Sequence, residues 1–318
     1  MAFSTKEAWD NMTKNGENIV IVTHYGPDGD AVGSCFALAY ALKKAGFSPK
    51  VVLDNYNDKL NVVDGSEFIF KGDTRIMPID LLICLDCGDF ARVAAPGDLF
   101  ARAFVTINVD HHMGNDGFAT HNYVDTTAPS TCEIVFSIIN PFVPMTKDMA
   151  SALYLGMVTD TGGFRYSATT PKTMEIAGKL MSVGIDFTTI QQRAVYTRSK
   201  VENAIFSKAL QNLVHMPNGL TYTTITQVEM AEAGADYSDL EGIAEHMLSI
   251  EGTKIAAFFN ERPVRTKVSF RSKEYEINTI AAKFGGGGHK FAAAASFESN
   301  FDEGVAAVLA ATERFLDA

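Results

Sequence analysis

The stretch NIVIVTHYGPDGDAVGSCFALAYALKKAG, residues 18–46, decides the fold. Its first seven residues, 18–24, form a nearly continuous run of valine and isoleucine, which is typical of a strand buried on both faces of a parallel sheet. A turn rich in glycine and aspartate follows, and an apolar helical pattern then continues to Gly46. A strand, a turn and a helix in this order predict the start of a doubly wound α/β fold.

Similar apolar runs recur through the first half of the chain. We expect further strands at 49–54, 80–86 and 104–110, and helices at 131–140, 147–158 and 171–184. Because strands alternate with helices, the sequence predicts a doubly wound, mostly parallel sheet.

The pattern changes after polar helical residues at 187–214. Strands are expected at 221–226, 254–261 and 265–272, with helices between them, in a smaller mixed α/β domain with antiparallel character. A chain of 318 residues usually forms more than one core. The predicted organisation is a first domain over 1–190, a helical linker over 191–214 and a second domain over 215–318.

Charge limits the kinds of partner. The net charge of −11 argues against binding long nucleic acid through a broad basic surface. The segment 254–290 nevertheless holds eight Lys and Arg and three Glu, which favours a small anionic ligand. The N-terminal residues lack the apolar core of a secretory signal, and no apolar run reaches the roughly 20 residues that span a bilayer. We therefore expect a cytoplasmic protein without a membrane segment.

Two of the four cysteines, Cys84 and Cys87, form a C-x-x-C pattern that is compatible with zinc or redox chemistry. They lie in a predicted strand, however, where positions three apart face opposite sides. We expect the two sulfur atoms to point apart, and we favour small buried side chains.

Acidic and histidine residues form four clusters that we place at strand ends. Ligand sites of open α/β sheets lie outside the carboxyl ends of the strands, so these clusters should converge. The clusters are His24 with Asp28 and Asp30, Asp86 with Asp89, Asp110 with His111 and His112, and Asp160 after the run LYLGMV.

Clustered carboxylates repel one another and require a counter-charge. Interleaved imidazoles favour Mn²⁺, with Zn²⁺, Fe²⁺ or Co²⁺ as alternatives, whereas Mg²⁺ alone prefers oxygen ligands. Six such ligands with one shared carboxylate can hold two ions roughly 3.5–4 Å apart, which activate water against phosphorus. Each residue taken singly also fits a turn or a helix cap. The turn at 28–30 could instead bind a dinucleotide phosphate, but neither glycine-rich phosphate motif is present there.

Five motifs occur in a characteristic order. They are HYGPDGDAVGS (24–34), LDCGD (85–89), VDHH (109–112), TDTGGFRYS (159–167) and GGGGHKFAAAA (285–295). Together they resemble the DHH/DHHA1 phosphoesterase family, most of all its nanoRNase and 3′-phosphoadenosine-5′-phosphate (pAp) phosphatase branch. The resemblance extends over essentially the whole chain and implies a catalytic DHH domain followed by a substrate-binding DHHA1 domain.

The resemblance also implies roles for individual residues. Two manganese ions would share Asp86, while Asp110 would orient a histidine and His112 would face the scissile phosphate. The first ion would be held by His24, Asp28 and Asp86, and the second by Asp30, Asp86, His111 and Asp160. Substrate would be bound by Gly286, Gly287, Gly288 and His289, with Arg271 as our candidate phosphate clamp.

The implied activity is hydrolysis of very short RNA, linear pApA or pAp, with a homodimer as one expected state. A cyclic di-AMP phosphodiesterase is the main alternative. Three other classes are disfavoured. A manganese pyrophosphatase would end in a basic S-R-K-K-type motif, and a single-strand DNA exonuclease would carry further domains. A non-catalytic sensor would lack a metal ligand. One departure is Ala294, where the family usually has glycine. Its methyl group would narrow the substrate approach or pack into a helix, which leaves substrate length open.

Overall fold

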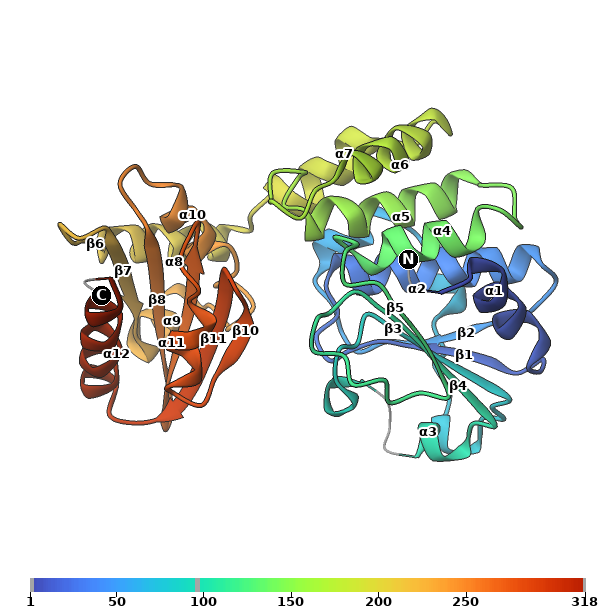
Figure 1. The fold of residues 1–318 in the computed structure, drawn as a ribbon, viewed down its shortest axis with the longest axis horizontal. Coiled ribbons are helices and arrows are strands. Elements are labelled where there is room, and N and C mark those ends of the chain that lie inside the picture. Colours follow the sequence, from blue (N-terminus) through green and yellow to red (C-terminus); the bar gives the residue numbers. More distant parts are fainter. Residues whose placement is uncertain (1–2, 95–97, 317–318) are drawn as a thin grey trace. The chain divides into compact units, whose positions relative to one another are not determined.

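The computed structural model describes residues 3–94 and 98–316 and divides into two compact units (Figure 1). Unit 1 comprises Met1–Thr197 and unit 2 comprises Arg198–Ala318, so the division falls inside the segment predicted as a linker. Each unit has its own sheet and its own apolar cores.

The sheet of unit 1 has five strands in the order β2-β1-β3-β4-β5, and all neighbouring strands are parallel. β1 and β3 are buried along their whole length, as their valine, isoleucine and leucine runs predict. The short polar strand β5 was not predicted, because its sequence HNYV lacks an apolar run. The strands are β1 (Ile19–Val22), β2 (Lys50–Val52), β3 (Leu81–Leu85), β4 (Val105–Asp110) and β5 (His121–Val124).

Helices cover this sheet on both faces, which confirms the doubly wound α/β prediction. Alternate residues of β1 enter different cores: Ile19 and Ile21 pack with the helices α1, α2, α4 and α5, whereas Val20 and Val22 pack with Leu99 of α3 (Figure 1). The helices are α1 (Thr5–Lys14), α2 (Gly29–Lys44), α3 (Leu99–Arg102), α4 (Thr131–Ile139), α5 (Lys147–Asp160), α6 (Pro171–Ser182) and α7 (Phe187–Gln191), with a π-helical turn η5 (Gln192–Tyr196) and short 3₁₀ turns η1 (Asp58–Val62), η2 (Ser66–Phe68), η3 (Thr74–Ile76) and η4 (Phe90–Arg92).

Unit 2 is a mixed α/β domain, as predicted. Its sheet has the order β10-β11-β9-β8-β7-β6, in which only the β7–β8 pair is parallel among the described strands. The helices α11 and α12 pack on one core, and α8, α9 and α10 pack on another. The elements are α8 (Lys200–Gln211), β6 (Val214–His215), β7 (Leu220–Ile225), α9 (Gln227–Ala233), α10 (Ile243–Ser249), β8 (Ile255–Arg262), β9 (Arg265–Ser272), α11 (Asn278–Ala282), β10 (Gly287–His289), β11 (Ala292–Glu298) and α12 (Phe301–Leu316).

The structure bears on two local expectations. Ala294 lies in strand β11, where it pairs with Ser269 of β9 and Gly287 of β10, so it is not part of a helix. The alternative, that its methyl group narrows the substrate approach, stays a prediction. The expectation that Cys84 and Cys87 face opposite sides was wrong: both pack in the same apolar cluster, because β3 ends at Leu85 and the chain then leaves the strand conformation. Both cysteines are free and buried, and burial raises the pKa of the Cys84 thiol well above its usual value. Cys84 therefore packs as a neutral side chain.

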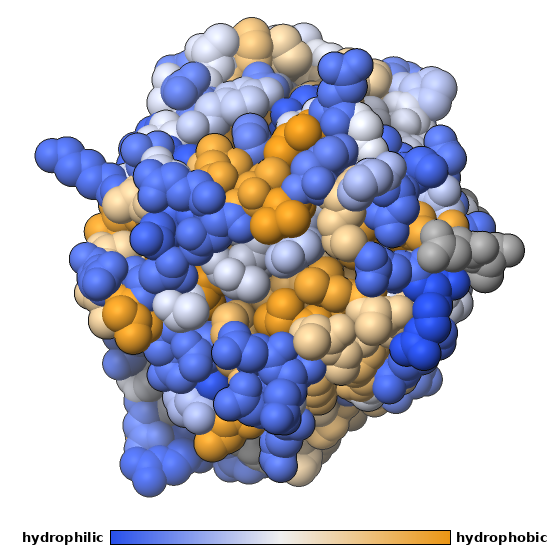
Figure 2. Space-filling view, turned by 90° about the vertical axis from the view of Figure 1, so that its left-hand side faces the viewer, coloured by the Kyte–Doolittle hydropathy of each residue, from blue (hydrophilic) through white to orange (hydrophobic). Residues whose placement is uncertain are grey.

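The surface mixes apolar and polar side chains. Figure 2 shows several apolar patches among hydrophilic residues, which is normal for a folded protein surface. Within the described residues, every helix is too short or too polar to span a bilayer.

Candidate metal centre

Loops at the carboxyl ends of β1, β3 and β4 bring the predicted metal ligands together. Three groups have ligand atoms within 4.8 Å of one another. Asp86 is common to two of these groups, as expected of a shared ligand, and His111 is also common to two. The groups are His24 with Asp28 and Asp86, Asp30 with His111 and Asp160, and Asp86 with His111 and His112.

Asp160 reaches this centre in a different way from the prediction. It is the last residue of helix α5, so it does not follow a strand. Gly29 allows the start of α2 and the end of α5 to pack closely, because a Cβ atom at this position would lie 2.4 Å from Oγ1 of Thr159. This close contact between the two helix ends places Asp160 next to the strand-end ligands. Its Oδ2 lies 3.3 Å from Nε2 of His111.

Asp86 occupies the middle of the cluster. It is 2% exposed and has a positive φ of 60°, which is uncommon for a residue other than glycine. Its Oδ2 lies 3.6 Å from Nε2 of His24, and its Oδ1 lies 3.5 Å from Nε2 of His111. The two oxygens therefore face imidazoles from different loops, an arrangement that suits a carboxylate shared by two cations.

Asp30 is held by the N-terminus of helix α4. The backbone N–H groups of Thr131 and Cys132 donate to its two oxygens at 2.6 and 2.9 Å. The hydroxyl group of Thr131 also donates to Oδ1 of Asp86, at 3.0 Å. The first turn of α4 thus orients two of the predicted ligands. Sequence reasoning missed this role, although Ser130 and Thr131 at the start of a predicted helix are a recognisable signal.

The metal-free cluster carries unfavourable negative charge. Burial, with the nearby charges of Asp86 and Asp28, raises the pKa of Asp30 well above its usual value. Burial raises the pKa of Asp160 in the same way, with a further contribution from Asp30. Carboxyl groups in such a site are difficult to ionise without a cation.

The histidines supply part of the missing positive charge. Burial alone would lower the pKa of His24, but the nearby carboxylates of Asp86 and Asp28 raise it to about 9. Nδ1 of His24 lies 2.9 Å from the carbonyl oxygen of Tyr25, which orients Nε2 toward the carboxylates. Burial acts in the opposite direction on Asp86, but the nearby imidazoles of His24, His111 and His112 hold the pKa of Asp86 well below its usual value.

His112 is oriented by Asp110. Its Nδ1 lies 2.7 Å from Oδ1 of Asp110, whose other oxygen accepts a hydrogen bond of 2.7 Å from the Asn115 amide. Asp110 is completely buried. The hydrogen bond with Asp110 raises the pKa of His112, which favours the imidazolium form.

The residues present fit divalent cations. All ion pairs of Asp28, Asp86, Asp110 and Asp160 within the described part of the chain are with histidines, and none is with lysine or arginine. Of these carboxylates, Asp86 and Asp110 are buried without a permanent cation. Together with the interleaved imidazoles, the carboxylates form a mixed oxygen and nitrogen set of the kind that transition metals bind.

The predicted substrate-binding glycines have a clear structural role. Cβ atoms at Gly286 and Gly288 would lie 2.2 and 2.6 Å from the carbonyl oxygens of Ala294 and Ala292, so packing against β11 requires glycine at both positions. Gly287 differs, because nothing lies within 4 Å of its Cβ direction. The side chain of His289 lies outside the described part of the structure.

The guanidinium group of Arg271 is anchored within unit 2. Its Nε donates to Glu245 at 2.7 Å, and a terminal nitrogen donates to the carbonyl oxygen of Phe270 at 2.8 Å. A phosphate ligand would therefore have to share Arg271 with Glu245.

Comparison with known proteins identifies the family. The model of the DHH family, N-terminal domain, matches residues 18–157, and the DHHA1 domain model matches residues 219–318. The bifunctional oligoribonuclease and PAP phosphatase NrnA of Thermus thermophilus is 31% identical over 301 residues, which cover 94% of this chain and 90% of that protein. The chain belongs to the DHH family. The resemblance predicted from the five motifs is confirmed.

Further relatives agree with this DHH-family assignment. The bifunctional oligoribonuclease and PAP phosphatase NrnA of Bacillus subtilis is 26% identical, with coverage of 89% of this chain and 90% of that protein. Among solved structures, an exopolyphosphatase-related protein from Bacteroides fragilis has a TM-score of 0.87 and 28% identity, and the match covers 98% of this chain and 95% of that one. The chain is a DHH-family phosphoester hydrolase.

Proposed function

We propose that this hydrolase uses two manganese ions to cleave very short oligoribonucleotides such as nanoRNA and pApA, the phosphomonoester of pAp, or both. The observation that carries the proposal is the meeting of all six predicted ligands around Asp86. The NrnA proteins of T. thermophilus and B. subtilis, which are named for both activities, support the choice of substrates. We further propose that the enzyme is cytoplasmic and that it forms a homodimer.

The proposed division of ligands is supported by two of the three observed groups, with Asp86 added to the second as the shared ligand. One ion would be held by His24, Asp28 and Asp86, and the other by Asp30, Asp86, His111 and Asp160. When bound, the two ions would supply a water nucleophile at neutral pH and positive charge for the phosphoryl group. The α4 N-terminus fixes Asp30 before any ion binds, so part of the site is preorganised.

His112 has a separate task in this proposal. Because its hydrogen bond with Asp110 favours the protonated form, it can donate an N–H to an oxygen of the scissile phosphate. Asp110 has no contact with substrate in this scheme and acts by orienting the ring.

We assign substrate binding in unit 2 to Arg271, Gly286, Gly287, Gly288 and His289. Gly287 supports this assignment most directly, since it lies on the edge strand β10 with open space beside it. Backbone N–H groups next to glycine can approach an anion closely.

A metal and substrate panel tests the function. The chelated enzyme would be reloaded with Mn²⁺, Mg²⁺ or Zn²⁺ and assayed on pAp, pApA, short RNA, cyclic di-AMP and pyrophosphate. We expect manganese-dependent turnover of pAp, pApA or short RNA. Preference for cyclic di-AMP would select the cyclic dinucleotide alternative, and activity on pyrophosphate alone would overturn the proposal.

The Asp86→Ala variant tests the shared ligand. We expect turnover to fall below detection, because both ions lose a ligand. Asp148→Asn is the matched control, since this exposed carboxylate lies in the first turn of α5, at the other end of the helix from Asp160. Near-normal turnover in a pure Asp86→Ala sample would defeat the two-ion model.

A further inference from the structure

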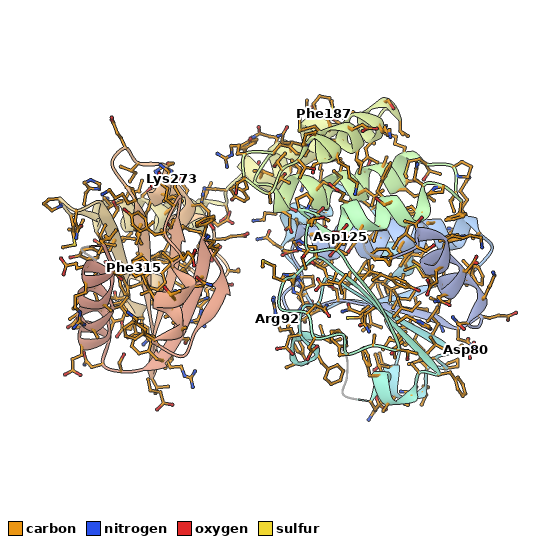
Figure 3. The ribbon with its side chains drawn as sticks, in the orientation of Figure 1. Asp80, Arg92, Asp125, Phe187, Lys273 and Phe315 are labelled. Atoms are coloured by element: carbon orange, nitrogen blue, oxygen red, sulfur yellow. The ribbon has the colours of Figure 1, made fainter. Side chains whose placement is uncertain are left out.

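Arg92 is fixed beside the metal centre by its backbone. It is the last residue of η4, and its carbonyl oxygen accepts a hydrogen bond of 2.9 Å from the N–H of Tyr25. The next residue, Val93, forms an antiparallel bridge with the metal ligand His24. In Figure 3, Arg92 lies at the end of unit 1 opposite Asp80, which directly precedes β3.

The turn that carries Arg92 is well supported. Asp89 accepts a hydrogen bond of 2.8 Å from the N–H of Ala91 and so caps the turn. The ring of Phe90 packs against Phe100 and Phe118, with centroids 5.0 and 5.7 Å apart. The position of Arg92 is therefore defined by packing and does not depend on its own side chain.

The side chain of Arg92 is exposed and lies in electrostatic range of His112. Its positive charge acts to lower the pKa of His112, against the larger raising effect of the hydrogen bond with Asp110. Within the described residues no ion pair involves Arg92. Arg75 and Arg102 in the same unit differ, because each has a carboxylate partner, Asp73 and Asp98 respectively.

Arg92 therefore places a positive charge next to the loop of the metal ligand His24, without an ion-pair partner among the described residues. An unpaired guanidinium beside a site that binds cations is unfavourable unless an anion binds there as well. Two bound cations in the adjacent site would increase the positive potential further. The complementary ligand is a compact anion with several acceptor oxygens, such as a phosphoryl group.

We propose that Arg92 binds the scissile phosphoryl group of the substrate, together with His112. This inference rests on the proposed function and deepens it. A guanidinium can donate two parallel N–H groups to two phosphoryl oxygens, and its charge does not depend on pH in the physiological range. Such a contact strengthens as charge develops on the phosphoryl oxygens, so it contributes to turnover as well as binding.

The test compares Arg92→Gln and Arg92→Lys with the control Arg75→Gln. Arg75 is also an exposed arginine of unit 1. It lies in the turn η3, which precedes β3, whereas Arg92 follows the carboxyl end of β3. Each manganese-loaded protein is assayed for kcat/KM on pAp and on 3′-AMP, which lacks the second phosphate. Binding of orthophosphate and of Mn²⁺ is measured by calorimetry, and folding by thermal unfolding.

We expect Arg92→Gln to lower kcat/KM by about 10²-fold or more on both substrates, the size of loss seen for other groups that stabilise developing charge. Orthophosphate binding should weaken at least tenfold, Arg92→Lys should recover part of both losses, and Mn²⁺ affinity should stay the same. Arg75→Gln should match the wild type.

Several outcomes would overturn the assignment. A loss confined to pAp would place Arg92 at the second phosphate, and a loss of Mn²⁺ affinity would make its role structural. Unchanged orthophosphate binding in Arg92→Gln would exclude phosphate recognition altogether. The orthophosphate measurement keeps the two proposals distinguishable, because it tests Arg92 even if the wild type hydrolyses none of the nucleotides.

Discussion

At the scale of single residues, Asp86 shows how local strain serves the metal centre. A non-glycine residue in the left-handed region usually costs about 1–3 kcal/mol and is retained where the surroundings determine it. Here the N–H of Asp86 donates to the carbonyl oxygen of Val109 in the neighbouring strand, at 3.0 Å. That bond holds the turn in which the two carboxylate oxygens face His24 and His111.

Thr131 gives a residue-scale prediction. Replacing it with valine removes the hydroxyl donor to Asp86 but keeps the shape and the backbone N–H that binds Asp30. Loss of a group that orients a metal ligand typically costs 10–100-fold in metal affinity, so we expect Thr131→Val to weaken Mn²⁺ binding by roughly that factor. Calorimetric titration of the chelated protein measures it.

Thr131→Ser is the control for this change, because serine keeps the hydroxyl group. It should bind Mn²⁺ about as tightly as the wild type. Equal Mn²⁺ affinities for Thr131→Val and the wild type would show that Asp86 does not need this hydrogen bond.

At the scale of elements, close helix packing decides where the ligands lie. α2 and α5 approach so closely that small residues are needed at their contact. A Cβ atom at Gly33 would lie 2.4 Å from the carbonyl oxygen of Ala152, and one at Gly156 would lie 2.3 Å from Sγ of Cys132 and 2.6 Å from Oδ1 of Asp30. Metal binding and helix packing are therefore coupled at Asp30.

Gly156→Ala should disturb both properties. The added methyl group would also lie 2.9 Å from the backbone Cα of Asp30, so the helices must shift. Overpacking of this kind typically costs about 1–3 kcal/mol, which urea unfolding would detect, and we also expect weaker Mn²⁺ binding.

Gly178→Ala provides the contrast in a neighbouring helix. Gly178 is exposed in α6 with nothing within 4 Å of its Cβ direction. Alanine there should leave stability unchanged or raise it by up to about 1 kcal/mol. Equal unfolding free energies for the two alanine variants would contradict the packing argument.

At the end of the sheet away from the metal centre, Asp80 forms hydrogen bonds that join the start of β3 to the start of β1 and that depend on pH. Oδ2 of Asp80 accepts hydrogen bonds from the backbone N–H groups of Glu17 and Asn18 and from the Asn18 amide, at 2.9–3.0 Å. The hydrogen bonds from Asn18 lower the pKa of Asp80 below its usual 3.8. Because the folded-state pKa is the lower one, this stabilisation is present above the usual pKa and is lost as pH falls through the folded value.

We therefore expect Asp80→Ala to be less stable than the wild type at pH 7, and the difference to shrink as the pH is lowered below 3.8. Urea unfolding at several pH values measures it. Asp80→Asn, which keeps one acceptor oxygen, should lie between the two proteins. A difference that does not change with pH would show that ionisation of Asp80 contributes nothing.

At the scale of the whole molecule, chemistry and recognition are assigned to different units. Unit 1 contains every described residue of the metal centre, and unit 2 contains the predicted substrate-binding residues. The two units have separate cores, so a change in one should leave the core of the other intact.

Arg271→Gln tests this division of roles. If Arg271 clamps a substrate phosphate, its loss should raise KM by about 10–100-fold, because hydrogen bonds to charged groups contribute about 1.5–3 kcal/mol. Mn²⁺ affinity should not change. Steady-state kinetics on pAp and pApA measure the effect.

Arg265→Gln is the matched control, since Arg265 starts the same strand and pairs with Glu298 at 3.7 Å. It should leave KM unaltered. A wild-type KM in Arg271→Gln would remove Arg271 from the substrate site.

Much of the site could be predicted because its ligands lie in short sequence patterns. The strands before His24, Asp86 and Asp110 are apolar runs, and ligands that follow parallel strands must meet at one edge of the sheet. Asp160 was correctly grouped with them but for the wrong reason, since a helix end places it there. Arg92 carried no such signal, because a basic residue three positions after Asp89 is ordinary in a sequence.

By itself, the sequence determined the apolar strands, the α/β class of the fold and the identity of the candidate ligands, because these follow from local apolar periodicity and short motifs. The strands β5, β6, β10 and β11 were not among the predicted ones. Only the tertiary structure decided which groups hold those ligands in place. The α4 N–H groups on Asp30, the helix contact at Gly29 that admits Asp160, and the backbone bond that fixes Arg92 beside His24 all join segments distant in sequence. Such contacts depend on packing and on distances of a few ångströms, which no local pattern of residues encodes.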